Sequence, residues 1–284
     1  MPTEPQRPAM PIRRPLSFVR RSNRLKPSYQ RVWDAALGEE LLDIPHGDHD
    51  TSVAPGFSID WAAEFGRSEA PLIVEIGSGS GEAVARAAAA HPEKDFLAIE
   101  VYKPGAAQLA SRLRREQLSN VRVAVANAPE VLDVLLPQGS VAELWIFFPD
   151  PWHKKKHNKR RLIQDEFISR AARVLPEGGL WRLATDWSGY AEQMREVISA
   201  APAFENLHAG ERAGEQSPLT EVRLGDLDSL SLGKDVHPLP WEEAVDTEGG
   251  WAPRFAGRVT TDFEAKAVEA GRRIFDLTFV RRPA

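Results

Sequence analysis

The chain has 284 residues, a formal net charge of −5 at pH 7, 42% hydrophobic and 27% charged residues, and no cysteine. This composition is typical of a globular protein of one large or two small domains, and it excludes disulfides, thiolate nucleophiles and cysteine-based zinc sites. The acidic balance excludes a uniformly basic nucleic-acid binder, so any such binding requires a local basic patch.

The sequence predicts neither a membrane helix nor an export signal. No apolar stretch approaches the ~20 residues that a membrane helix needs. The Arg13-Arg14 pair has no apolar region behind it, so it does not have the form of a signal peptide. Together with the lack of cysteine, this favours a cytoplasmic protein.

The N-terminal residues 1–50 are rich in proline and arginine and show no sustained period. They predict a flexible basic segment. Within it, residues 17–30 combine basic side chains with two aromatic ones, so we expect this stretch to order on a surface or on a partner. Residues 51–284 are then a single domain.

From residue 71 onward, short apolar runs alternate with helical patterns. The run LIVEIG is typical of a buried parallel strand, and the alanine-rich stretch after it of a helix. Such alternation predicts βαβ units, that is, an α/β fold with a Rossmann-like, doubly wound, mostly parallel sheet. Strands are expected at 72–77, 95–101, 120–126, 141–148, 180–186 and 272–282, and helices at 81–91, 104–118, 128–136, 159–175 and 187–200.

Residues 209–256 interrupt this rhythm. They are dense in glycine, proline, aspartate and glutamate, which predicts a long acidic insertion or mobile loop. Its charge would repel RNA, so we expect it to lie away from any RNA path.

A glycine turn follows the first strand, in the order Glu75-Ile-Gly77-Ser-Gly79-Ser-Gly81. Glycines at a strand-to-helix turn let the backbone approach a ligand closely, although a tight turn without a ligand is the alternative. The second strand ends at Glu100, which parallel topology places beside the turn. A carboxylate there can accept both hydroxyls of a ribose, and its alternative is a solvated acid at the end of a strand.

The charges near the turn favour one kind of nucleoside cofactor. No lysine or arginine stands where a bound diphosphate would need one, and Glu82 would repel an anion at the start of the helix. A cationic cofactor such as S-adenosylmethionine is therefore favoured over NAD.

The fourth strand runs into Phe-Phe-Pro-Asp-Pro-Trp, with Asp150 between two prolines that restrict its backbone. The carboxyl end of this strand opens on the same edge, so Asp150 is expected to face the reactive end of the cofactor. Trp152 is expected to pack beneath the loop, with stacking on a base as the alternative.

Six of the eight residues at 154–161 are lysine or arginine. The simple interpretation is a solvated helix start. Because the run adjoins the ligand edge of the sheet, it also suits phosphate binding while a base is presented to the cofactor. A polyanionic substrate explains why positive charge gathers here in an acidic chain.

Several stretches together resemble the bacterial tRNA (guanine-N7)-methyltransferase family, whose class I fold uses S-adenosylmethionine to methylate the variable-loop guanine of tRNA. The resemblance covers roughly residues 70–205 and 257–281, and SFVRRSNR near the start is similar to that family's N-terminal segment. It is carried by IVEIGSGSGE, FLAIEVYKPG, FFPDPWHKKKHNKRR, LATDW and VTTDFEAKAVEAGRRIFDL.

The resemblance implies a role for each matching residue. Asp150 would be the catalytic carboxylate and would also border the cofactor. The other implied cofactor residues are Glu75, Gly77, Gly79, Glu100 and Asn127, and the implied substrate residues are Lys154, Asp186, Thr261, Asp262, Phe263 and Glu264.

Three features depart from the family's pattern, one of which is that the acidic insertion at 209–256 is longer than the family's typical linker. Asn127 stands where the family has aspartate near the adenine, and an asparagine can still accept from the adenine amino group, so binding of altered strength is expected. Lys266 stands where the family has arginine, and a lysine cannot make the forked contact.

Local alternatives exist for three groups of residues. Asp186 could instead cap the helix that follows it. Thr261 and Glu264 have the spacing of a capping box. His153 and His157 flank three lysines, but no third ligand accompanies them, so a metal site is not expected.

Two other functions remain open at this level. One is methyl transfer to another RNA or to a small-molecule acceptor. The other is a non-catalytic RNA-binding protein on a degenerate methyltransferase fold, of which Asn127 would be a symptom. Oligomeric state does not follow from the sequence.

The N-terminal arginines lead to a testable prediction. If Arg20, Arg21 and Arg24 contact tRNA phosphates, replacing all three by alanine will flatten the slope of log affinity against log salt concentration by about 2 to 3. An Arg13→Ala/Arg14→Ala variant is the matched control. An unchanged slope in the triple variant would identify the segment as a loose basic tail.

Overall fold

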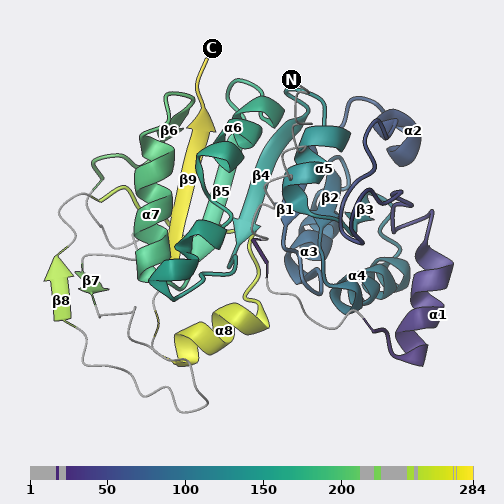
Figure 1. The fold of residues 1–284 in the computed structure, drawn as a ribbon, viewed down its shortest axis with the longest axis horizontal. Coiled ribbons are helices and arrows are strands. Elements are labelled where there is room, and N and C mark those ends of the chain that lie inside the picture. The colour runs from purple at the N-terminus through teal and green to yellow at the C-terminus, as the bar shows by residue number, and fades with distance from the viewer. Residues whose placement is uncertain are drawn as a thin grey trace, which may run out of the picture.

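The computed structural model describes residues 17–18, 24–211, 221–224, 242–245, 249–270, 272 and 274–283. Figure 1 shows the helices and strands of these ranges. The helices are α1 (Pro27–Ala36), α2 (Trp61–Phe65), α3 (Glu82–Ala90), α4 (Lys103–Glu116), α5 (Ala128–Leu135), α6 (Asp165–Val174), α7 (Ser188–Ser199), α8 (Asp262–Glu269) and the 3₁₀ helix η1 (Lys155–Arg160). The strands are β1 (Leu72–Ile76), β2 (Asp95–Ile99), β3 (Val121–Ala124), β4 (Val141–Phe147), β5 (Leu180–Thr185), β6 (Phe204–Asn206), β7 (Glu221–Leu224), β8 (Glu242–Val245) and β9 (Phe275–Arg281).

One sheet of seven strands, in the order β3-β2-β1-β4-β5-β9-β6, organises the fold. The first five strands are parallel, and β9 is antiparallel to both β5 and β6. The order reverses direction between β1 and β4, which is the switch point where α/β sheets bind ligands. The predicted α/β, doubly wound fold is confirmed, with an antiparallel edge that the sequence pattern did not specify.

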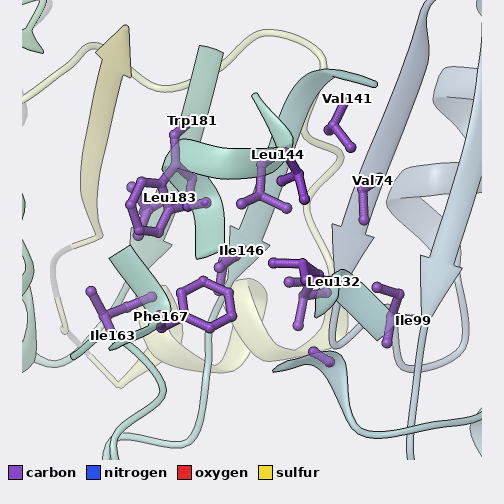
Figure 2. Close-up of a cluster of buried hydrophobic side chains, with 14 of the residues drawn as sticks. Val74, Ile99, Leu132, Val141, Leu144, Ile146, Ile163, Phe167, Trp181 and Leu183 are labelled. Atoms are coloured by element: carbon purple, nitrogen blue, oxygen red, sulfur yellow. The ribbon is translucent and has the colours of Figure 1, made fainter. Parts of the chain in front are cut away.

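Helices cover both faces of the sheet because its central strands are apolar on both sides. Helices α5, α6 and α7 pack on one face and α3 and α4 on the other (Figure 1). Figure 2 shows the first of these cores, where Leu132 of α5 and Phe167 of α6 lie among strand residues such as Ile146 and Leu183. This two-sided burial is typical of parallel sheets.

The strand register brings the carboxyl ends of β1, β2 and β4 to one edge. Ile76 pairs with Ile99 on one side and with Ile146 on the other. The residues that follow these strands therefore emerge side by side. Helix α8 lies beyond the same end of the sheet (Figure 1).

The predicted end of the flexible N-terminal segment is wrong. The flexible segment was expected to reach residue 50, but α1 begins at Pro27, and Leu41, Leu42 and Ile44 are buried. A backbone bridge joins Leu41 to Val123 of β3. These residues cover the edge of the sheet and so belong to the folded domain.

The helix expected at 159–175 is two separate helices. The 3₁₀ helix η1 ends at Arg160 and α6 begins at Asp165. Between them the chain leaves helical geometry and buries Arg161 and Ile163, whose backbone N–H donates to the Tyr190 hydroxyl at 3.1 Å.

The acidic insertion expected at 209–256 is described only in part. Strands β7 and β8 form an antiparallel pair within it, and residues 212–220, 225–241 and 246–248 lie outside the described ranges. Its last part is packed rather than loose, because Trp251 is buried against Phe275 of β9, with ring centroids 5.2 Å apart. Among the described residues, no helix combines the length and the apolar character needed to cross a bilayer.

Candidate active site

The glycine turn joins β1 to α3 in a conformation that excludes larger residues. Gly81 has a φ of +74°, and a Cβ there would come within 2.2 Å of the Leu109 side chain. Gly105 of α4 packs so closely that its Cβ would lie 2.7 Å from the carbonyl oxygen of Gly79. Both contacts come from α4, so that helix holds the turn in a conformation whose backbone is available to a ligand without rearrangement.

Glu100 holds the same turn from the end of β2. One of its carboxylate oxygens accepts from the Gly79 N–H at 2.7 Å, and the other accepts from the N–H groups of Val101 and Tyr102 at 2.7 and 2.8 Å. Each carboxylate oxygen has two lone pairs, so these three bonds leave one acceptor position, on the oxygen bonded to Gly79, for a ribose hydroxyl rather than the two expected. The predicted ribose contact remains a prediction, and the fold adds a role for Glu100 in shaping the turn.

Glu75 lies on β1 and is buried beside the turn. Its carboxyl accepts from the backbone N–H of Val84, while Oε2 has no hydrogen-bond partner among the described residues. Burial, with a smaller contribution from the negative charge of Glu100, raises the pKa of Glu75 to about 8. Glu75 is therefore protonated at neutral pH.

A pocket opens at the carboxyl edge and brings the predicted cofactor residues together. Glu75 does not line it but lies close enough to Glu100 to feel its charge. Ser17 and Phe18 also line it, which the sequence did not predict, although the basic aromatic stretch at 17–30 was expected to order on a surface. The predicted residues in the wall are Gly77, Gly79, Glu100, Asn127 and Asp150.

Asn127 has a partner that explains its amide orientation. Its Nδ2 donates to Glu130 Oε1 at 3.0 Å, and Glu130 Oε2 accepts from the Val53 N–H at 2.9 Å. The amide oxygen is then the remaining acceptor at this position in the pocket wall. This suits the predicted contact with an adenine amino group, which remains a prediction.

The loop that carries Asp150 is held in an uncommon backbone conformation. Phe148 and Trp152 have φ values of +53° and +45°, which non-glycine residues seldom adopt. The Trp152 indole N–H donates to the carbonyl of Ser17 at 3.0 Å, and Arg161 donates to the carbonyl of Pro151 at 2.8 Å. Such strain persists only where surrounding contacts enforce it, so the position of the Asp150 backbone is well determined. The expected packing role of Trp152 agrees with these contacts.

The basic run divides into exposed and buried cations. The exposed cations are Lys154, Lys155 and Lys156 at the start of η1 and Lys159 in its last turn. Arg161 is buried, and its guanidinium also donates to Gln193 Oε1 at 2.6 Å. The expectation that the whole run faces a substrate is therefore wrong for Arg161, which secures the Asp150 loop instead.

His153 stacks on Trp187 with ring centroids 4.1 Å apart. Its pKa is lowered by partial burial and by the charge of Arg161, against the opposing effect of Asp186 and Asp150. A neutral imidazole thus lies within electrostatic reach of both acids. Among the described residues, no group of three or more His, Asp or Glu side chains is arranged to hold a metal.

The predicted substrate residues lie around this edge. Asp186 forms an ion pair with Arg272 at 2.8 Å, and Trp187, not Asp186, occupies the N-cap of α7, so the capping alternative for Asp186 is wrong. Thr261 Oγ1 accepts from the Glu264 N–H at 3.3 Å and caps α8. The backbone of Asp262 and Phe263 forms the first turn of that helix.

Glu264 differs from the expectation of a simple capping box. Its carboxylate is buried and forms ion pairs with Arg254 at 2.8 Å and Arg258 at 3.2 Å. Lys266 is exposed in the last turn of α8. Arg20 and Arg21 lie outside the described residues, and Arg24 is exposed just before α1. The predicted substrate contacts of all these residues remain predictions.

A glycine turn after the first strand and an acid after the second, at the switch point of a Rossmann-like sheet, define a class of nucleoside-binding α/β proteins. The sequence model of a family described as putative methyltransferase matches residues 69–224. The chain is 54% identical over 278 residues to the tRNA (guanine-N(7)-)-methyltransferase of Paenarthrobacter aurescens strain TC1, an alignment covering 95% of this chain and 92% of that protein.

Further relatives carry the same name. The protein from Arthrobacter sp. strain FB24 is 53% identical over 277 residues, covering 94% of this chain and 86% of the relative. The chain belongs to the tRNA (guanine-N(7)-)-methyltransferase family. A solved structure titled 16S rRNA methyltransferase KamB is more distant, at 15% identity and a TM-score of 0.47, covering 84% of this chain and 99% of that one.

The raised pKa of Glu75 predicts an unusual pH dependence of stability. The unfolded chain loses this proton near pH 4.5, whereas the folded protein keeps it up to about pH 8. The contribution of Glu75 to the free energy of unfolding is therefore greatest below pH 4.5 and is lost as the pH rises to about 8. Each pH unit in this window changes the stability by ~1.4 kcal/mol, so a few kcal/mol are expected in all.

Urea unfolding of the wild type and of Glu75→Gln across this pH range measures the effect. The stability of the wild type relative to the variant should fall steadily with rising pH. Glu177→Gln, at an exposed site, is the control and should show no such trend. Parallel curves for the wild type and Glu75→Gln would mean that Glu75 is already ionised at neutral pH.

Proposed function

We propose that this protein transfers a methyl group from S-adenosylmethionine to N7 of a guanine in the variable loop of tRNA. The observation that carries the proposal is the position of Asp150, held in a constrained loop at a pocket that it shares with the glycine turn and Glu100. Exposed lysines follow directly outside that pocket. The substrate is the one that the names of the relatives state.

The residues at the pocket fit a cationic nucleoside cofactor. Glu75 has a buried carboxyl oxygen without a partner, and Glu100 lies beside it. The Gly77 and Gly79 backbones face open space, because a Cβ at either would meet no atom within 4 Å. Glu75 and the glycines would hold the methionine end, Glu100 the ribose, and Asn127 the adenine. The bound cofactor supplies an activated methyl group on a sulfonium.

The acceptor requires little chemistry from the protein. Guanine N7 has a free lone pair and no proton to lose, so no general base is needed. What the protein must supply is alignment of N7 with the methyl group, and such positioning can lower a barrier by ~7–11 kcal/mol. The rigid backbone on both sides of Asp150 is suited to that task.

Asp150 would act on the purine ring. Positive charge develops on the guanine during transfer, and a carboxylate beside the ring stabilises that charge. The same carboxylate can accept from the guanine N1–H or amino group and so orient the base. Lys154 and the neighbouring exposed lysines would bind tRNA phosphates, while Asp186 and the Thr261–Glu264 turn would contact the substrate.

The proposed function is tested by incubating the protein with an unmodified tRNA transcript and labelled S-adenosylmethionine. The product is then mapped by borohydride reduction and aniline cleavage, which cuts the chain at N7-methylguanine. A single cut in the variable loop is the expected result. Label in another RNA or small molecule would indicate a different acceptor, and no label with no calorimetric heat of cofactor binding would indicate a non-catalytic RNA-binding protein.

Replacing Asp150 by asparagine tests its catalytic role. The change keeps the shape of the side chain and removes its charge, so kcat with saturating tRNA should fall roughly 100-fold or more. Asp133→Asn, at an exposed site on α5 that pairs with Arg170, is the control and should keep normal turnover. Near-normal kcat in Asp150→Asn would remove Asp150 from the mechanism.

A further inference from the structure

Arg258 is a fully buried cation where α8, β9 and the Asp150 loop meet. Its guanidinium binds Asp276 of β9 through two N–H groups, with Nη2 3.0 Å from Oδ2 and Nη1 bonded to Oδ1. It also donates to Glu264 of α8, from Nη2 to Oε1 at 3.2 Å and from Nε to Oε2 at 3.3 Å. The fork geometry of arginine allows both carboxylates to be held at once.

The same guanidinium lies near the two phenylalanines that lead into the Asp150 loop. Its Cζ is 5.4 Å from the ring centroid of Phe147 and 5.6 Å from that of Phe148, within cation–π range. Phe147 ends β4, and Phe148 has the first positive φ of the loop. Phe147, Phe148 and Asp150 all line the pocket. Arg258 therefore contacts the pocket wall from behind.

The charges of this cluster balance within it. Arg254 also binds Glu264, so two guanidinium groups face the carboxylates of Glu264 and Asp276. The cluster needs no further counterion. Buried ion pairs contribute little net stability compared with apolar packing, so stability alone is a weak reason for placing a charged fork here. The contacts of the guanidinium instead fix the relative positions of α8, β9 and the Asp150 loop.

We infer that Arg258 is a positioning residue for methyl transfer, which sets the start of α8 and the Asp150 loop at a fixed separation. The inference rests on the proposed function, because it takes Asp150 as the catalytic group. Arg258 does not line the pocket that holds Asp150. It acts through Phe148 on one side and through Glu264 on the other.

The test is Arg258→Lys, which keeps the charge but loses the fork. We expect kcat to fall about tenfold or more, with the KM for tRNA and the dissociation constant for S-adenosylmethionine changed less than about threefold. Arg254→Lys is the matched control. Arg254 is the other arginine that binds Glu264, and the Arg254 side chain is 42% exposed. This variant should leave kcat within about twofold of the wild type.

Hydrogen exchange separates positioning from activity. In Arg258→Lys the backbone amides of Phe148, Asp150 and Trp152 should exchange faster than in the wild type, and in Arg254→Lys they should not. If Arg258→Lys does not fold, Phe148→Leu is the second variant. It removes one of the two rings near Arg258 and leaves the four charged side chains of the cluster unchanged. It should give the same faster exchange.

The outcomes of these measurements are distinct. A wild-type protein that fails to methylate tRNA contradicts the proposed function, and the catalytic part of the inference falls with it. The positioning role is overturned if hydrogen exchange and kcat stay unchanged in Arg258→Lys. It is also overturned if both change equally in Arg254→Lys. In either case the proposed function stands.

Discussion

The carboxylate of Glu100 is the contact on which the site depends. Three backbone N–H groups donate to it, from Gly79 in the turn after β1 and from Val101 and Tyr102 after β2. It therefore joins the ends of two neighbouring strands and holds the glycine turn open toward the pocket. The close packing of Gly105 against Gly79 supports the turn from the other side. Without this arrangement the turn would be an ordinary connection between a strand and a helix.

Opposite charges are segregated at the carboxyl edge of the sheet. Acids lie at or beneath the pocket, where the negative charge of Glu100 suits a cationic ligand and Glu75 presents an unpartnered oxygen, whereas exposed lysines lie outside it around η1. An acidic protein can therefore attract a polyanion at one rim while its interior selects a cation. Neutral His153, stacked on Trp187 beside two acids, adds no further positive charge within the rim.

Much of the fold and of the pocket could be predicted from the sequence, because continuous apolar strands and glycine turns are local signals. Parallel topology then placed Gly77, Glu100 and Asp150 at one edge without further information. Contacts between distant segments could not be predicted in this way. A basic run does not reveal which of its cations is buried, as Arg161 is, and a Pro-rich N-terminus does not reveal that Phe18 lines the pocket. The buried cluster around Arg258 joins residues 18 positions apart through tertiary packing alone.

The most direct test of the central claim is a crystal structure of the protein with S-adenosylhomocysteine, the product that remains after methyl transfer. We predict that its ribose contacts Glu100, its amino acid end lies on the glycine turn, and its sulfur faces Asp150. A product molecule bound elsewhere would contradict the account, for instance in the cavity of about 840 Å³ beside α3 that Arg86 and Arg254 line. So would a molecule bound in the pocket with its sulfur directed away from Asp150.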